Sequence, residues 1–270
     1  MFNSFRFFRV RPLRVLPVVA ISSYAISHQY WNQKIYLDTQ QQVQQQQQQN
    51  SIIVDSSISP FPKQISKSNL ISQNFTLLGH GIRSVTFIGF KVYGIGIYIA
   101  NSDISKASQI LNSFEKNNQN PEFPALNNPT ESDHIIETLL DNNIKFLIRL
   151  SPVRNTDFNH LKDGLIKSIL AHPSSKTLKE QLSKGLEELR AVFSKTRGSV
   201  PKDDLLIMEI LSNGEMSVNY INQKQDKIKE MGIVNEPLVG KILMQQYLSS
   251  NKPLSESLKK SCIEGLNNLI

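Results

Sequence analysis

A glycine-rich segment in the first half of the chain contains two residues that could carry chemistry. His80 lies between Gly79 and Gly81, and Arg83 follows it by three residues. The imidazole could ligate a metal ion or a haem iron, or it could be a turn histidine that bonds to nearby backbone. Arg83 lies in an apolar stretch, where burying an unpaired guanidinium is prohibitively costly. We therefore expect Arg83 either to form a salt bridge across a sheet or to bind an anionic ligand.

Two more arginines flank a proline that follows an apolar stretch. Arg149 and Arg154 lie on either side of Pro152 in the run FLIRLSPVR. With Arg83 they could form a cationic rim that suits a carboxylate or a propionate. A solvated turn would have the same sequence, so the residues alone leave both interpretations open.

Common catalytic signatures are absent from the sequence. It contains no P-loop, H-E-x-x-H, G-x-S-x-G or Rossmann glycine fingerprint. Its one cysteine, Cys262, excludes an internal disulfide, a cysteine-based zinc site and covalent haem attachment through C-x-x-C-H. Five basic residues precede the first acidic residue, Asp38, and without them the formal net charge falls from +7 to +2. A nearly neutral remainder argues against binding to nucleic acid, which needs clustered lysines and arginines.

These candidate residues must be positioned by a predicted sheet and its helices. Residues 74–101 are rich in β-branched and aromatic side chains and predict two or three consecutive strands. Residues 144–151 predict a buried strand, and the apolar runs on either side of Asn213-Gly214 predict a hairpin. Apolar residues at helical spacing predict helices at about 103–117, 133–142, 156–172, 175–195, 236–248 and 254–268. Partly segregated strands and helices indicate an α+β fold, an antiparallel β-sheet covered by helices.

The predicted strand at 90–99 has a notable glycine pair. Because side chains alternate between the faces of a strand, Gly94 and Gly96 share one face with Tyr98, while Tyr93 takes the other. The two glycines leave a trough in their face. A helix or a ligand must approach the backbone there.

Residues 1–37 have the composition of a leader. Residues 1–16 contain four arginines among Phe, Val and Leu and no acidic residue, which is typical of a mitochondrial transit peptide. A disordered basic tail is the alternative. The mildly apolar stretch 15–27 has 13 residues, fewer than the ~20 that a membrane span needs. It could form a weak inner-membrane anchor or be the rest of a cleaved presequence.

A glutamine tract separates this leader from the rest of the chain. Residues 40–49 are nine glutamines interrupted by Val43, and such a tract cannot bury enough apolar surface to offset the entropy lost on ordering. The polar stretch continues to about residue 68. We therefore predict a mitochondrial presequence with a weak membrane anchor at 1–37, a disordered Gln-rich linker at 38–69 and a folded domain at 70–270.

The run LLGHGIRSVTFIGFKVYGIGIYIA at 77–100 resembles the chalcone isomerase family. The matching elements are G-x-G-x-R and a strand pair that ends in G-I-Y-I. The resemblance continues through FLIRLSPVR, the Asn213-Gly214 hairpin and the last two helices, and it covers roughly residues 70–270. With the basic leader, the whole chain is similar to the fungal mitochondrial branch of the family. The resemblance implies an antiparallel sheet with helices layered on one face and a cleft between them.

The resemblance also implies which positions line that cleft. The catalytic arginine of the enzyme corresponds to Arg83, and the threonine on its next strand corresponds to Tyr93. The tyrosine and asparagine on the helix after the central strand correspond to Phe158 and Leu165, and the threonine near the penultimate helix corresponds to Tyr247. Phe158 and Leu165 cannot donate the hydrogen bonds that stabilise a developing enolate-like charge, so we expect most catalysis to be lost. An apolar cleft with one arginine suits a flat or elongated hydrophobic anion.

For the fungal branch, the resemblance implies that this ligand is non-covalently bound haem. His80, as a metal ligand, or Tyr93 would then be the axial group. A fatty acid whose carboxylate pairs with Arg83 is the first alternative, and a working isomerase is the second. A structural protein whose cleft is filled by its own side chains is a fourth hypothesis. We expect a mitochondrial location, association with the inner membrane, and a small hydrophobic ligand as the partner.

Overall fold

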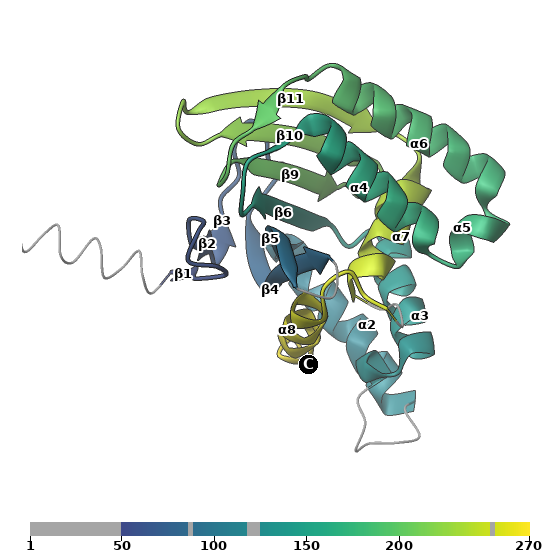
Figure 1. The fold of residues 1–270 in the computed structure, drawn as a ribbon. Coiled ribbons are helices and arrows are strands. Elements are labelled where there is room, and N and C mark those ends of the chain that lie inside the picture. Colours follow the sequence, from purple (N-terminus) through teal and green to yellow (C-terminus); the bar gives the residue numbers. More distant parts are fainter. Residues whose placement is uncertain (1–49, 86–88, 118–124, 249–251) are drawn as a thin grey trace, which may run out of the picture. The chain divides into compact units, whose positions relative to one another are not determined.

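The computed structural model describes residues 50–85, 89–117, 125–248 and 252–270 (Figure 1). A seven-stranded sheet in the order β11-β10-β9-β6-β5-β4-β3 runs through the domain, and each neighbouring pair is antiparallel. Its strands are β3 (Gln64–Ile65), β4 (Phe75–Val85), β5 (Phe90–Ala100), β6 (Phe146–Pro152), β9 (Leu205–Ile210), β10 (Met216–Asn222) and β11 (Lys227–Val234). The predicted α+β fold class is therefore confirmed.

Helices cover one face of this sheet (Figure 1). They are α2 (Ile104–Asn117), α3 (Pro129–Asp141), α4 (Phe158–Ala171), α5 (Ser174–Thr177), α6 (Lys179–Ser194), α7 (Pro237–Leu248) and α8 (Glu256–Asn267), with short 3₁₀ turns at Asn101–Asp103 and Ala125–Asn127. Alternate apolar residues of the strands, such as Ile97 and Ile148, form one hydrophobic cluster with the buried sides of these helices. Burial on this scale is the main source of the domain's stability. α7 lies at the centre of the cluster, and Tyr247 near its end is fully buried.

Most predicted elements are present with shifted ends. β4 and β5 form the strand pair predicted at 74–101, and the predicted hairpin joins β9 to β10 through Gly214, whose φ is +81°. The helix predicted at 175–195 is divided into α5 and α6. Thr156, where the helix predicted at 156–172 was expected to begin, belongs instead to β7 (Thr156–Asp157), which pairs with β8 (Ser199–Val200), and Asp157 caps α4. β11 was missed because five of its eight residues are exposed and three are charged, so it lacks the apolar alternation of a strand.

The prediction of a disordered linker is wrong for residues 50–69. Residues 50–65, which we call the strap, belong to the same compact unit as the rest of the domain. Within the strap, β1 (Ser51–Ile52) pairs with β2 (Phe61–Pro62), and β3 then pairs with β4. Phe61 has 0% exposure, so this polar stretch still contains an apolar anchor. The remaining linker residues, 38–49, and the predicted presequence lie outside the described residues.

The strap fills the glycine trough of β5. A Cβ on Gly94 would lie 2.5 Å from Cδ1 of Ile58, and one on Gly96 would lie 3.0 Å from Cδ2 of Phe61. The expected close approach to the backbone is therefore present, but its source is neither a helix nor a ligand. Glycine is required at these positions because any larger residue would displace the strap.

The opposite end of the chain covers the free edge of β4. Ser261 and Ser257 of α8 accept hydrogen bonds from the backbone N–H groups of His80 and Ile82, each at 3.2 Å. The helix approaches so closely that a Cβ on Gly265 would lie 1.9 Å from the carbonyl oxygen of Leu78. Covering an edge in this way satisfies backbone groups that would otherwise be open to pairing with another chain.

Candidate ligand-binding site

Three of the predicted site residues meet on the helix-covered face of the sheet. Arg83 of β4 lies directly opposite Tyr93 of β5 in the strand register. The hydroxyl of Tyr93 is 2.9 Å from the hydroxyl of Tyr247 on α7, and both tyrosines are buried. Nη1 of Arg83 donates to the carbonyl oxygen of Leu254 at 2.5 Å, in the segment that leads into α8. This cluster of a guanidinium and two phenols joins strand, central helix and last helix.

The cluster has more hydrogen-bond donors than acceptors. Burial raises the pKa of Tyr93, and burial followed by the neighbouring Tyr93 raises the pKa of Tyr247 well above its ordinary value, so both phenols keep their protons. One hydroxyl proton serves the bond between the two tyrosines, which leaves the other without an acceptor in this pair. Among the described residues, no carboxylate forms an ion pair with Arg83. Such an excess of donors favours an anion.

The two apolar positions of the predicted cleft belong to the same hydrophobic cluster. Phe158 and Leu165 lie on α4 and are buried. The Phe158 ring packs edge-on against Tyr220, with 4.9 Å between ring centroids. Neither side chain can donate a hydrogen bond. Phe158 thus packs toward β10, three strands away from β5, and both side chains belong to the apolar core between the sheet and its helices.

His80 lies on the opposite face of the sheet from Arg83. Its partner across β5 is Gly96, whose missing side chain would point at Phe61, whereas the partner of Arg83 is Tyr93. Directly paired residues share a face. The predicted site that combines His80 with Arg83 is therefore wrong. The sequence could have shown this, because residues three positions apart in a strand point to opposite faces of the sheet.

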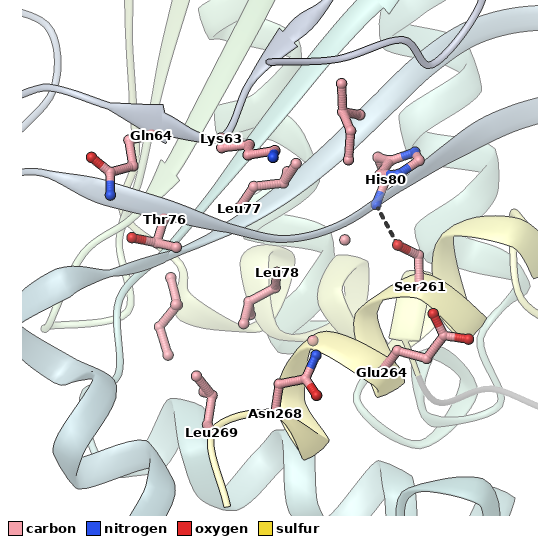
Figure 2. A pocket seen from close by; sticks show the side chains of 14 residues that line it. Lys63, Gln64, Thr76, Leu77, Leu78, His80, Ser261, Glu264, Asn268 and Leu269 are labelled. Carbon is pink, nitrogen blue, oxygen red and sulfur yellow. Dashed lines mark hydrogen bonds between the residues drawn. The ribbon is translucent and has the colours of Figure 1, made fainter. Parts of the chain in front are cut away.

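His80 instead borders a pocket of about 580 Å³ between the strap, β4 and the end of α8 (Figure 2). Burial lowers the pKa of His80, so its half-buried imidazole is neutral near pH 7. The other polar side chains around the pocket are Lys63, Gln64, Thr76, Ser261, Glu264 and Asn268. Within the described residues, no group of three or more His, Cys, Asp or Glu could hold a metal ion. A metal at His80 would thus need most of its ligands from elsewhere, as haem iron does.

The three arginines do not form a rim. Arg149 of β6 pairs with Gly96 of β5 and lies on the same face as the strap. Its guanidinium carbon is 4.6 Å from the centroid of the Phe61 ring. Arg154 is exposed and lies 3.6 Å from the centroid of Phe90. Alternation along β6 predicts that Arg149 points to the opposite face from its two neighbours in the strand. Both faces of this strand are apolar, so the sequence did not reveal whether Arg149 lies on the same face as Arg83.

The tyrosine pair is buried, with Tyr93 8% and Tyr247 0% exposed. Two further pockets, of about 430 and 520 Å³, lie over the outer surfaces of α8 and α6. None of these three pockets is lined by Arg83, Tyr93 or Tyr247. The sequence also did not indicate that Leu254 offers its carbonyl to Arg83, because a backbone contact between distant segments leaves no pattern in residue types.

Comparison with models of protein families shows which family the chain belongs to. The family model described as "Chalcone isomerase like" matches residues 73–263. The chain belongs to the chalcone isomerase-like family. Within the family it is similar to proteins named "Altered inheritance of mitochondria protein 18, mitochondrial". The relative from Debaryomyces hansenii is 52% identical over 87% of this chain and 81% of the relative. The relative from Kluyveromyces lactis is 46% identical over 80% of this chain and 72% of its own length.

Among solved structures, this chalcone isomerase-like chain is similar to a fatty-acid binding protein of Arabidopsis thaliana. The TM-score is 0.55 at 17% identity, over 80% of this chain and 98% of the other. At this identity the similarity shows the fold alone. The names of the yeast relatives support a mitochondrial location for the family member described here. In the described part of the chain, every helix is too short or too polar to cross a membrane.

Proposed function

We propose that the domain binds a carboxylate with an apolar body and does not transform it. The observation that carries this proposal is the surplus of donors at Arg83, Tyr93 and Tyr247 inside a hydrophobic cluster. A carboxylate has two oxygens and only accepts hydrogen bonds, so it complements a guanidinium and a spare phenol proton. The apolar body would lie among the side chains of the hydrophobic cluster to which both tyrosines belong.

Each residue has a separate role in this proposal. Arg83 supplies the charge and exchanges its bond to the Leu254 carbonyl for one to the ligand. The Tyr93–Tyr247 pair fixes the second oxygen through its remaining proton. Because both tyrosines are buried, ligand entry must move neighbouring side chains apart, and part of the binding energy is used for that rearrangement.

A fatty acid is the ligand that this arrangement favours most. The Arabidopsis thaliana protein of the same fold is named a fatty-acid binding protein, and a single carboxylate on a flexible chain needs only one anionic contact. Catalysis is not expected, because Phe158 and Leu165 lack the donors that the resemblance to the enzyme requires. Incubation with a chalcone should therefore give no cyclisation above the uncatalysed rate.

Replacing Arg83 by methionine should weaken binding of a dansyl-labelled fatty acid at least ~10-fold. A hydrogen bond to a charged group contributes roughly 1.5–3 kcal/mol, and about 1.4 kcal/mol corresponds to a factor of ten. Fluorescence titration of the purified full chain measures this change. Tyr247→Phe should weaken binding by a smaller factor, because the Tyr93 hydroxyl remains.

The control for this measurement is Arg154→Met. It removes an exposed arginine that contacts Phe90 and should leave the dissociation constant unchanged. Equal affinities of Arg83→Met and the unaltered chain would contradict the proposal. A failure of the unaltered chain to bind any acyl probe would do the same.

Haem is the second candidate ligand, and a separate observation supports it. The neutral imidazole of His80 borders a pocket of about 580 Å³, within the ~300–1,000 Å³ range of small-molecule sites. A neutral imidazole is the form that ligates iron. Tyr93 is a poor axial group, because burial raises its pKa and keeps the phenol protonated. Lys63 is the cation of this pocket that could hold a propionate.

Titration with hemin tests this candidate independently of the fatty-acid site. His80→Ala should abolish the Soret band that hemin gains on binding, and the exposed His160→Ala should leave it unchanged. Arg83→Met should also leave it unchanged, because Arg83 lies on the other face of the sheet. Absence of a Soret band with the unaltered chain would remove haem from consideration.

We further propose that residues 1–16 act as a mitochondrial transit peptide and that residues 15–27 anchor the chain weakly at the inner membrane. The composition of these segments supports both proposals. Import into isolated mitochondria followed by carbonate extraction tests them. Release of the imported protein by carbonate would contradict the anchor, and failure to be imported would contradict the transit peptide.

A further inference from the structure

Arg149 is buried on the strap-covered face without a matching anion. Its side chain is 8% exposed, and Nε has no hydrogen-bond partner. Among the described residues, no carboxylate lies within ion-pair distance of it. Asp203 is close enough to favour the charged guanidinium, but its oxygens accept bonds from Ser59 and Ser151. Leaving a buried cation without a paired anion is costly, so its position needs an explanation.

The main contact of this guanidinium is the ring of Phe61. Phe61 lies over Arg149 at 4.6 Å and over Gly96, where a Cβ would come within 3.0 Å of it. A cation–π contact compensates only part of the loss of solvation. The Phe61 ring thus packs against a guanidinium that has no paired carboxylate among the described residues.

An open pocket adjoins this plugged position. His80, Gly96 and Arg149 are successive partners across β4, β5 and β6, and neighbouring strands are about 4.8 Å apart. His80 lines the 580 Å³ pocket. Leu77 borders both places, since it lines the pocket and its Cδ1 lies 3.3 Å from the Cβ position on Gly96. The pocket, the glycine trough and Arg149 thus lie in one row across three strands, and Phe61 lies between the pocket and Arg149.

We propose that this row is a second binding site for a carboxylate with an apolar body, and that Phe61 is a displaceable plug at its anionic end. The apolar body lies in the pocket beside Leu77, and the carboxylate reaches Arg149 once Phe61 moves out. This site is distinct from the Arg83 cluster, which is on the other face of the sheet. A fatty acid and a haem propionate share the chemistry that Arg149 recognises.

The strap is held by a few polar contacts to distant parts of the chain and by the burial of Ile58 and Phe61, and displacement of Phe61 must break those nearest to it. The backbone N–H and hydroxyl of Ser59 donate to Asp203 at 2.7 and 2.5 Å. Tyr98 donates to the carbonyl of Pro62 at 3.0 Å. Asp55 pairs with Lys91 on the surface, where ion pairs contribute little. Opening the strap therefore costs free energy, which the pairing of a carboxylate with Arg149 must supply.

The stoichiometry of dansyl-labelled fatty acid on the full chain tests the plug. The unaltered chain should bind one equivalent at micromolar probe, at the Arg83 cluster. Phe61→Ala should bind a second equivalent. On the Phe61→Ala background, Arg149→Met should abolish the second equivalent and Arg83→Met should abolish the first. The same titrations with hemin separate the two ligand sources, because a haem-specific site gains hemin without gaining the fatty-acid probe.

Ser59→Ala provides the test without creating a cavity, should Phe61→Ala fail to fold. Saturating probe should accelerate amide exchange of residues 51–62 at least fivefold in this variant, because the ligand replaces the plug. The inference is overturned if Phe61→Ala folds and gains no probe, or if the gained equivalent survives Arg149→Met. Unchanged exchange of the strap in Ser59→Ala at saturating probe also overturns it. If the unaltered chain binds no equivalent that depends on Arg83, but Phe61→Ala still binds one that depends on Arg149, the proposed function is contradicted and this inference is not.

Discussion

Deletion of residues 1–62 is expected to lower the midpoint of thermal unfolding by about 10 °C or more, whereas deletion of residues 1–49 should leave it unchanged. The longer deletion removes Ile58 and Phe61 from the trough of β5. Burial of each such side chain contributes roughly 1.5–3 kcal/mol, and in a domain of this size 1 kcal/mol shifts the midpoint by about 2–4 °C. The bonds of Ser59 to Asp203 are lost as well.

Differential scanning calorimetry of the two truncated chains measures this difference. The shorter deletion is the matched control, since it ends where the compact unit begins. Equal midpoints for the two truncated chains would restore the interpretation of residues 50–62 as a linker. A midpoint that is restored by a hydrophobic carboxylate would instead strengthen the case for a ligand site beneath the strap.

The second large effect is expected for Gly265→Ala, which should destabilise the domain by about 3 kcal/mol or more. The added Cβ would lie 1.9 Å from the carbonyl oxygen of Leu78, and backbone on both sides cannot yield as a flexible side chain would. Inserting one methyl into a packed site costs about 1–3 kcal/mol, and here α8 must also move away from β4. The hydrogen bonds that Ser257 and Ser261 accept from the strand would then lengthen or break.

Gly164→Ala is the matched control for this substitution. Gly164 is also in a helix, α4, but a Cβ there meets nothing within 4 Å. Alanine should stabilise this exposed turn by about 0.5–1 kcal/mol, because it is the better helix former. Urea denaturation of both variants compares them. Similar stabilities for the two alanine variants would show that α8 does not depend on its close contact with β4.

The sequence predicted the parts of the fold whose signal is local. Alternation and β-branched residues located β4 and β5, and the Asn213-Gly214 turn located the β9–β10 hairpin. The strap was not predicted, because its few apolar residues, such as Ile58 and Phe61, are separated by polar ones and show no period. Their role depends on a trough more than 30 residues later in the chain.

The candidate site was predicted to a similar extent. Correspondence with the family brought Arg83, Tyr93 and Tyr247 together, and the structure places their side chains in one cluster. Residue type alone grouped His80 and Arg149 with Arg83 on the basis of charge and ligand chemistry. The strand register separates them, because faces of a sheet depend on pairing between strands that the sequence does not specify.

Sealing of the β4 edge by α8 has a consequence for the order of folding. The bond from His80 to Ser261 spans 181 residues, so this edge of the sheet stays bare until the final helix has been synthesised and has passed through any membrane that the chain crosses. Until then the exposed strand is open to pairing with other chains, and contacts of such long range form slowly. A newly made molecule would consequently depend on chaperones until α8 is in place, and loss of α8 should cause aggregation rather than a local defect.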